Sequence, residues 1–413
     1  MVTGIRSRLA GGPPSDPGPV RSSMWGLVAV VAAVACGSST EKPQPVAFDR
    51  PAMLKHIGEN MVLPIYRSVH TNAGELSSKV DDYCTALGTA GQQDALDAAR
   101  DAWRATMAQW QLAEMMLFGP VAMDGKALRD RIYSWDLVSS CAVDQDVMRK
   151  HDDPTGYDIT GRLSNVRGLD ALEYLLFATS LDGECAVNNK PPGWDGLSDP
   201  ERRQARCAFA RDAASDLSTQ TKSAVDAWAS ESGNYLADFA GAGQSASSFD
   251  SAQDAVNAVS DAMFYLDSQV KDMKLAEPAG IAMNRCAGVG TVCPDELESR
   301  YAGHSRENIV ANLRAFGMLF TGNGPDSLDG LGFEDFLRAA SADSLADNMG
   351  AAITAAVTAA EAIPGSMAGA LNTDIDAVVA THTAVKRITD DLKTQFLTVL
   401  GLDIPDDAAA DND

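Results

Sequence analysis

Apolar residues recur at steps of three and four along most of this chain, and that periodicity constrains its fold more than any other feature. Between residues 92 and 118 the repeat consists of Trp103, Met107, Trp110, Ala113 and Leu117. Such spacing places the side chains on one face of a helix, which must pack against a core. The sequence Phe-Gly-Pro at 118–120 ends this helix, because proline disfavours helical geometry in the residue before it.

Similar amphipathic runs, many of them alanine-rich, fill the rest of the chain, and alternating β-branched stretches are few. They predict further helices at approximately 46–70, 126–138, 163–178, 199–230, 249–275, 305–320, 333–361 and 366–399. Gly-, Pro- and Asn-rich pieces separate these runs. Long helices with short loops favour bundles, so we expect an all-α fold.

A serine- and glycine-rich break at 241–248 divides the runs into two halves. A weak echo links them, since segments 165–177 and 308–320 both begin with Asn and end with Leu-Phe. We therefore expect two packed helical-bundle halves related by an internal duplication. The expected organisation is a signal at 1–36, a polar tether at 37–45, an N-terminal bundle at 46–240, a C-terminal bundle at 241–403 and an acidic tail at 404–413.

The N-terminus has the pattern of an export signal. Three arginines precede an apolar run that is too short to span a bilayer and ends in Ala-Val-Ala-Cys at 33–36. This resembles a bacterial lipoprotein signal, in which Cys36 is lipidated, although Ala33 stands where Leu is usual. We expect a lipid-anchored protein of the bacterial cell envelope, held at the outer membrane and facing the periplasm or the cell surface. The alternative is an ordinary secreted protein that is cut after a small residue.

The chain carries 33 basic and 57 acidic residues, a formal charge of -24. Such a surface repels nucleic acid and anionic lipid, so we expect no nucleic-acid partner and no phosphate-binding role. It can attract cations.

Six cysteines remain when Cys36 is set aside, and an even number in an exported chain indicates disulfides. Two pairs are close in sequence and flank loop-like segments, which leaves a third pair by elimination. The predicted bonds are Cys185–Cys207, Cys286–Cys293 and Cys84–Cys141.

Segment 165–177, Asn-Val-Arg-Gly-Leu-Asp-Ala-Leu-Glu-Tyr-Leu-Leu-Phe, is apolar over most of a helical circumference yet contains Asp170 and Glu173. Residues three apart are neighbours on a helix, so the two acids repel each other. If the helix is buried, each carboxylate is costly unless it is paired, protonated or bound to a cation.

Two interpretations follow. The acids form a solvated stripe or pair with Arg167 or Arg162, or they belong to a hard-cation or acid/base site completed from elsewhere in the chain. Oxygen ligands favour calcium, magnesium, manganese or ferric iron over zinc.

The same segment resembles the signature of the imelysin family, whose pattern is GxHxxE. Gly168 and Glu173 fall on the family Gly and Glu, whereas Asp170 falls where the family has His. Further similarity spans roughly residues 50–400 and is carried by segments 102–120, 305–322 and 330–337. The resemblance implies two all-helical halves with a site near their contact, an envelope location and an association with iron acquisition. Some members are described as metallopeptidases.

Other residues at positions of the family pattern are candidates for the same site. Glu114 could supply a third carboxylate, and Asn165 or Asn308 a neutral oxygen. Ser305 matches a position that the family keeps as Ser, and it is also expected to cap the helix that follows His304. An Asp in place of His favours harder cations (Fe, Ca, Mn or Mg).

Peptidase chemistry receives little support from the residues. A zinc hydrolase needs about three ligands and a general base. The motif offers no His, and the five histidines are scattered without HExxH: His56, His70, His151, His304 and His382. We assign no catalytic residue.

Three functions remain open. The first is a non-enzymatic, imelysin-like envelope lipoprotein. It binds either a cation, with iron as one candidate, or a partner protein in metal uptake. The second is a metal-dependent peptidase. The third is a structural or adhesive scaffold, which predicts that Asp170 and Glu173 are exposed or neutralised by arginines.

Overall fold

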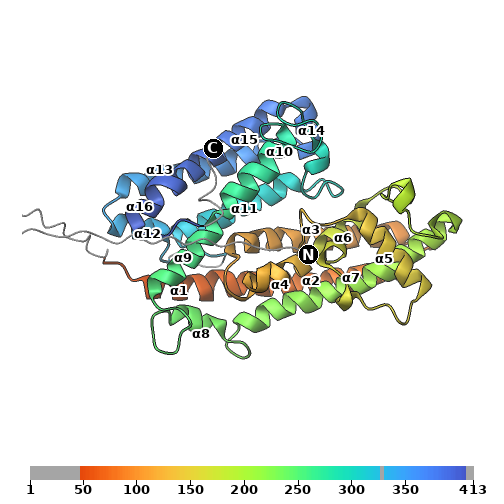
Figure 1. Ribbon diagram of the computed structural model, residues 1–413, viewed down its shortest axis with the longest axis horizontal. Coiled ribbons are helices and arrows are strands. Elements are labelled where there is room, and N and C mark those ends of the chain that lie inside the picture. The colour runs from red at the N-terminus through yellow and green to blue at the C-terminus, as the bar shows by residue number, and fades with distance from the viewer. Residues whose placement is uncertain (1–46, 326–329, 406–413) are drawn as a thin grey trace, which may run out of the picture. The chain divides into compact units, whose positions relative to one another are not determined.

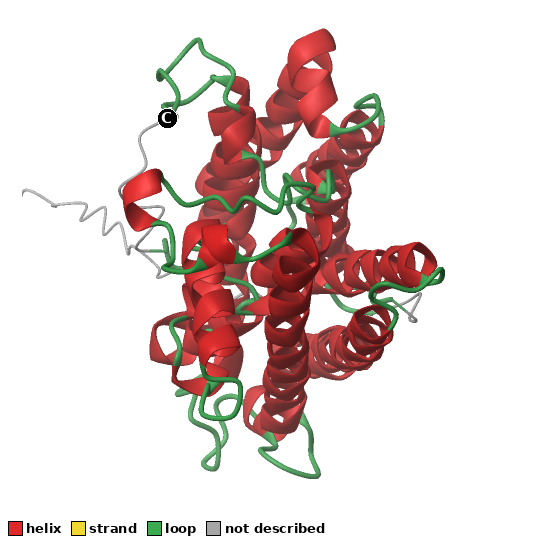
Figure 2. Ribbon diagram, turned by 90° about the vertical axis from the view of Figure 1, so that its right-hand side faces the viewer, coloured by secondary structure: helices red, strands yellow, loops and turns green. Residues whose placement is uncertain are grey.

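The structure is a computed structural model that describes residues 47–325 and 330–405. The signal with Cys36, the tether and most of the acidic tail lie outside the described residues. Every regular element within those two ranges is helical, and none is a strand (Figure 2). The predicted all-α fold is therefore confirmed.

The first helices form one continuous run from residue 50 to 85, longer than the predicted 46–70, because a π-helical turn at Gly58–Val62 joins them without a break. The helices up to residue 240 are α1 (Arg50–Ile57), α2 (Leu63–Thr85), α3 (Gln92–Ala113), α4 (Met123–Ile132), α5 (Ser140–Asp152), α6 (Gly168–Phe177), α7 (Asp199–Trp228) and α8 (Tyr235–Ala240).

Two predicted helices of the second half are each interrupted. The run 333–361 breaks at Ser341, whose φ of +59° cannot continue a right-handed helix, and the run 366–399 breaks near Asp374. The elements are α9 (Ala252–Met263), the π-helix η8 (Leu266–Ala276), α10 (Glu277–Ala279), α11 (Ser305–Thr321), α12 (Phe333–Ala339), α13 (Asp343–Glu361), α14 (Met367–Thr373), α15 (Ile375–Asp391), the π-helix η10 (Leu392–Phe396) and α16 (Leu397–Leu400).

Helix α3 lies at the centre of the packing. It runs alongside α2, which in turn packs along α7, and it also contacts α6 and α11 (Figure 1). Its predicted stripe is in the core, since Trp103, Met107 and Trp110 are fully buried. Helix α11 packs on α13, and α13 on α15. A boundary near residue 241 and an internal duplication stay predictions.

Three disulfides are present, and two of the predicted pairings are wrong. The bonds join Cys84 to Cys207, Cys141 to Cys185 and Cys286 to Cys293. Only the last agrees with the prediction. Proximity in sequence misled the other assignments, because the lengthwise packing of α2 against α7 brings Cys84 to Cys207 across 123 residues.

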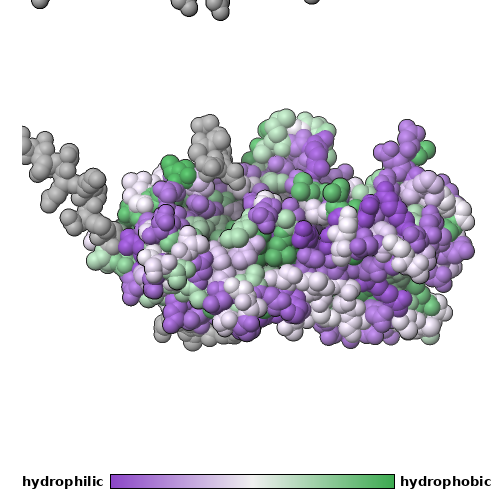
Figure 3. Space-filling view, turned by 60° about the horizontal axis from the view of Figure 1, so that its bottom comes forward, coloured by the Kyte–Doolittle hydropathy of each residue, from purple (hydrophilic) through white to green (hydrophobic). Residues whose placement is uncertain are grey.

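No helix among the described residues is long and apolar enough to cross a membrane. On the face in Figure 3, hydrophilic residues are mixed with small separate groups of hydrophobic ones.

Candidate functional site

Helix α6 carries the two motif acids and is buried on every side, Asp170 and Glu173 included. The expectation of a solvated acidic stripe is therefore wrong. Gly168 begins the helix with φ +74°, and a Cβ there would lie 2.4 Å from the carbonyl oxygen of Ile132. Only glycine allows α6 to start this close to the end of α4.

Asp170 is held by the chain that follows α4. The backbone N–H of Ser134 donates to its Oδ2 at 2.6 Å, and the Ser134 hydroxyl lies 3.4 Å from the same oxygen. The side chain of Trp103 on α3 fixes the start of α6 by donating to the carbonyl of Leu169 at 2.8 Å. Oδ1 of Asp170 has no hydrogen-bond partner among residues 47–325 and 330–405.

Glu173 is held by the loop before α11. The backbone N–H groups of Tyr301 and Ala302 donate to its Oε1 at 2.8 Å and 2.9 Å. The second oxygen, Oε2, likewise has no hydrogen-bond partner in the part of the chain that the structure describes. Two elements that are distant in sequence thus each present backbone donors to one motif carboxyl.

The arginines near the motif serve other acids. Arg167 forms a buried two-bond pair with Asp216, at 2.8 Å and 2.5 Å. Arg162 pairs with Asp146 at 2.8 Å. The predicted alternative, in which Arg167 or Arg162 neutralises the motif acids, is therefore wrong.

Both motif carboxyls bind protons more tightly than usual. Burial raises the pKa of Asp170 to about 7, although the Ser134 amide and the charge of Arg129 oppose the shift. Burial likewise raises the pKa of Glu173 to about 8, against the Ala302 and Tyr301 amides and with a further upward contribution from Asp170. A substantial fraction of each is a neutral acid at pH 7.

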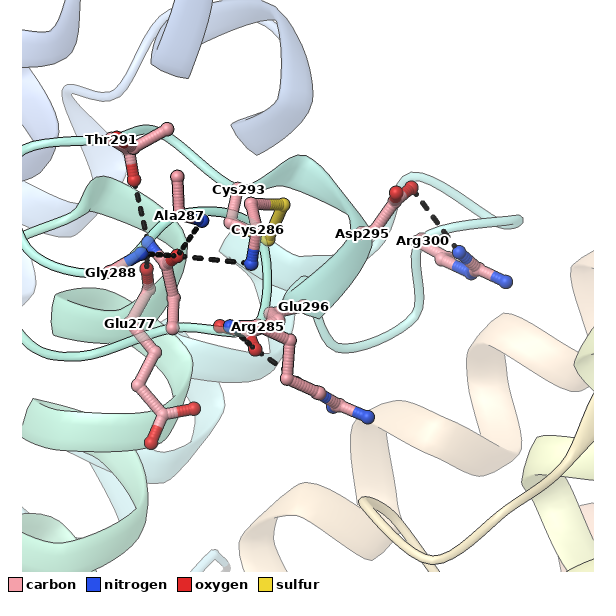
Figure 4. The surroundings of a disulfide bond; sticks show 11 residues. Glu277, Arg285, Cys286, Ala287, Gly288, Thr291, Cys293, Asp295, Glu296 and Arg300 are labelled. Atoms are coloured by element: carbon pink, nitrogen blue, oxygen red, sulfur yellow. Dashed lines mark hydrogen bonds and ion pairs between the residues drawn. A yellow bond between two sulfur atoms is a disulfide. The ribbon is translucent and has the colours of Figure 1, made fainter.

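Both carboxyls line a cavity of about 330 Å³, which we call the acidic cavity. Its wall includes the loop closed by the Cys286–Cys293 disulfide (Figure 4). The charged residues of the lining are Asp136, Asp170, Glu173, Asp295, Glu296, Arg285 and Arg300.

The two arginines of this cavity each form an ion pair with an acid of the same lining. Arg285 donates to Glu296 at 3.0 Å, and Arg300 lies 3.4 Å from Asp295 (Figure 4). The remaining acids, Asp136 included, have no cationic side chain within ion-pair distance in the described part of the chain. The lining of the acidic cavity therefore has more carboxyl groups than guanidinium groups.

Glu114 does not join the motif acids as a third free carboxylate. It is completely buried, accepts from Arg129 and Trp110 at 3.2 Å each and from the Tyr265 hydroxyl, and lies 3.6 Å from the ammonium of Lys274. Glu114 as a third ligand stays a prediction, and in the structure these donors and positive charges already surround its carboxylate.

Sequence reasoning missed the buried partners of that cluster. Lys274 lies 2.9 Å from Glu298, which also accepts from the Tyr133 hydroxyl at 2.6 Å. Lys274 further donates to Gln111 and Asn312, at 2.8 Å each. A lysine in a helical run normally signals a solvated face, so only the packing of η8 against α11 reveals its burial.

Ser305 and Asn308 do not contact the motif acids but bond to the loop that holds Glu173. The Ser305 hydroxyl donates to the carbonyl of Glu298, and Asn308 donates to the Ser299 hydroxyl at 3.0 Å. Both bonds hold the loop whose amides bind Glu173. The predicted cap at Ser305 is wrong, because it is the first residue of α11 and its hydroxyl faces backwards along the loop. Asn165 accepts from the Ser139 amide through its backbone carbonyl.

His304 lies apart from the acidic cavity. It packs edge-on against Trp103, with ring centroids 6.0 Å apart, and it lines a separate cavity between α3 and α11.

The sequence matches the imelysin family, which is catalogued among the peptidases, from residue 62 to residue 395. The protein belongs to the imelysin family. No curated protein matches the sequence.

Two solved structures share the imelysin fold of this chain. An imelysin-like protein from Psychrobacter arcticum is 18% identical with a TM-score of 0.64, over 87% of this chain and 98% of that one. A structure named a putative iron-regulated protein A precursor, from Parabacteroides distasonis, is also 18% identical with a TM-score of 0.64, over 85% of this chain and 94% of that one. These identities establish the shared fold alone.

Because some imelysins are described as metallopeptidases, we asked whether the side chains of this protein could hold a metal ion. Among residues 47–325 and 330–405, no three or more His, Cys, Asp or Glu side chains are grouped to hold one. The donor set therefore does not fit a three-ligand zinc site. It does offer Asp170 and Glu173 to a hard cation that keeps water in its other positions, as magnesium and calcium do.

Proposed function

We propose that this imelysin-family protein is a non-enzymatic binding protein of the bacterial envelope that takes up a hard cation between Asp170 and Glu173. The observation that carries the proposal is that both carboxyls are buried and held by backbone amides, form no ion pair with an arginine of residues 47–325 or 330–405, and line a cavity. A buried acid of this kind must be protonated or meet a cation.

Charge supports the same ligand class. The acidic cavity has five carboxyl side chains and two guanidinium groups, and both guanidinium groups are paired. Burial is the main cause of the raised pKa of Glu173, and the charge of Asp170, which adds to it, also attracts metal ions. Asp170 replaces a neutral nitrogen ligand by an anionic oxygen, which favours calcium, manganese, magnesium or iron.

A role in iron uptake is supported by the name of one structural neighbour and by the N-terminal segment of this chain. One neighbour of the same fold is named for iron regulation. The segment 1–36 resembles a lipoprotein signal, which supports an envelope location and a lipid anchor on Cys36. A metal-uptake partner in the envelope would complete this role.

The family's peptidase label supports a second candidate, a metal-dependent peptidase. The donor set argues against it, since two carboxyls without a His provide neither three zinc ligands nor a separate base. A titration with zinc in the presence of unfolded polypeptide distinguishes the two. Cleavage that a chelator stops and Glu173→Gln abolishes would establish the peptidase.

Calorimetric titration of the mature protein with calcium, manganese and ferrous chlorides tests the binding proposal. We expect saturable binding of at least one ion, and loss of that binding in the double variant Asp170→Asn, Glu173→Gln. Asp101→Asn is the control, because it removes the same type of charge from an exposed side chain. Absence of binding by all three ions, or equal binding by the double variant, would refute the proposal.

A further inference from the structure

A second cavity, of about 250 Å³, lies where α2, α3 and α7 meet the C-terminal end of α6. We call it the arginine cavity. Its lining is Tyr83, Gln92, Gln93, Leu96, Arg100, Leu175, Leu176, Ala178, Thr179, Leu181, Arg203, Arg206, Cys207 and Ala210.

The charge of this lining is opposite to that of the chain. Three arginines line the cavity and no Asp or Glu does, in a protein with a formal charge of -24. The nearest paired acid is Asp97, whose exposed carboxylate lies 3.3 Å from Arg100. Because acids outnumber bases by far elsewhere, a cavity lined by three guanidinium groups is a local exception.

Two of the arginines have a structural role that holds them in place. Arg100 donates to the carbonyl of Leu176 at 2.9 Å, and Arg206 donates to that of Tyr174 at 2.8 Å. These carbonyls belong to the last turn of α6, where cations are favourable. Each guanidinium group has five N–H donors, so both retain donors beyond these bonds.

Arg203 has no such structural role. It lies one turn before Arg206 on the same face of α7 and is half-buried. It makes no hydrogen bond or ion pair with any residue in 47–325 or 330–405. A half-buried guanidinium without a partner forgoes charge-assisted bonds that an anion in the cavity would supply.

The remaining lining adds polar and apolar contacts. Tyr83 faces the arginines, and their charges partly offset the effect of burial, which raises the pKa of its hydroxyl. The amide of Gln92 and the hydroxyl of Thr179 are further polar groups, while four leucines and two alanines give the cavity an apolar side. Such a lining suits an anion that carries a carbon skeleton better than a bare inorganic ion.

A disulfide and two side-chain hydrogen bonds hold the walls of the arginine cavity in place without a ligand. The Cys84–Cys207 disulfide joins α2 to α7 directly beside Tyr83 and Arg206. The bonds from Arg100 and Arg206 to the end of α6 fix the third side. Preorganised donors of this kind lower the cost of ordering on binding.

We propose that the arginine cavity binds a small organic oxyanion, with carboxylate or phosphate groups, through Arg100, Arg203 and Arg206. This site is separate from the acidic cavity and uses none of its residues. The overall acidity of the chain predicts no phosphate-binding role, but the local charge of the arginine cavity is opposite to that of the chain.

The test uses the mature protein, free of metal ions, with citrate and inorganic phosphate as probes in calorimetric titrations. We expect saturable binding of citrate, weakened about tenfold or more by Arg203→Gln. Since Arg203 has no hydrogen-bond or ion-pair partner to lose among the described residues, this variant should retain the wild-type melting temperature. Arg211→Gln is the matched control, because Arg211 is on the same helix but pairs with Asp81 outside the cavity.

The outcomes separate the ligand chemistries and the alternatives. Binding of citrate supports a carboxylate ligand, and binding of phosphate alone supports a phosphate ligand, provided that Arg203→Gln weakens it and Arg211→Gln does not. If neither anion binds, or if both variants weaken binding equally, the arginines serve only to stabilise the end of α6 and the proposal is overturned.

Discussion

The backbone N–H of Ser134 donates to Oδ2 of Asp170 at 2.6 Å, so an amide just after α4 holds the residue that falls on the histidine of the imelysin pattern in the resemblance described above. The Asp is therefore an integrated part of the site and not a solvent-exposed remnant. Its Oδ2 accepts this bond, and the side chain lines the acidic cavity.

The raised pKa values of Asp170 and Glu173 predict a pH-dependent stability. Between pH 4 and pH 8 the folded protein binds more protons at these groups than the unfolded chain, so their contribution to the free energy of unfolding falls as pH rises. Above about pH 8 this contribution is level. We expect Asp170→Asn and Glu173→Gln, which imitate the neutral acids, to flatten the slope in urea denaturation series.

The difference from wild type should reach a few kcal/mol at pH 9, in favour of the variants, and shrink towards pH 5. Asp101→Asn should leave the slope unchanged, because Asp101 is exposed. Equal slopes for wild type and the double variant would show that the buried acids do not titrate as described.

Gly168→Ala should destabilise the protein by roughly 1–3 kcal/mol, because it places a Cβ against the carbonyl of Ile132 and strains a left-handed residue. The matched control is Gly74→Ala within α2, where a Cβ meets nothing within 4 Å. The control should be neutral or slightly stabilising, since alanine favours a helix. Similar melting temperatures for the two variants would mean that α6 can begin without a glycine.

Asp170→His restores the family's residue and should change the metal preference. A neutral imidazole has only one nitrogen with a lone pair, so this nitrogen must face the ion and not the Ser134 amide that now binds the carboxylate. We expect calcium and manganese affinity to fall about tenfold or more and zinc affinity to rise, because imidazole is the softer ligand. Competition titrations with the three ions measure this. An unchanged order of affinities would mean that residue 170 does not contact the ion.

The helical class and the importance of segment 165–177 were predictable because both depend on local spacing. The segment is apolar on nearly every side, which indicates burial, but its two acids left a solvated stripe open until the structure showed all of α6 buried. The identity of those partners was not predictable, because Ser134, Tyr301 and Ala302 contribute backbone amides, which any residue type provides. Disulfide pairing failed for a related reason, since the packing of α2 on α7 is not encoded in cysteine spacing.

The arginine cavity shows the limit of composition as a guide. A formal charge of -24 describes the surface as a whole, whereas ligand recognition depends on the few residues that meet in one place. Arg100 and Arg203 are separated by more than a hundred positions and come together only because α3 and α7 both flank α2.

The most direct test of cation binding at Asp170 and Glu173 is the number of protons released when the ion binds. It is obtained from manganese titrations at pH 7 in two buffers with different ionisation enthalpies. Because the pKa values of the two acids are about 7 and about 8, binding at pH 7 should release about one to two protons, and nearly none at pH 9. Manganese binding without proton release at pH 7, or with the same release at pH 9, would contradict the account.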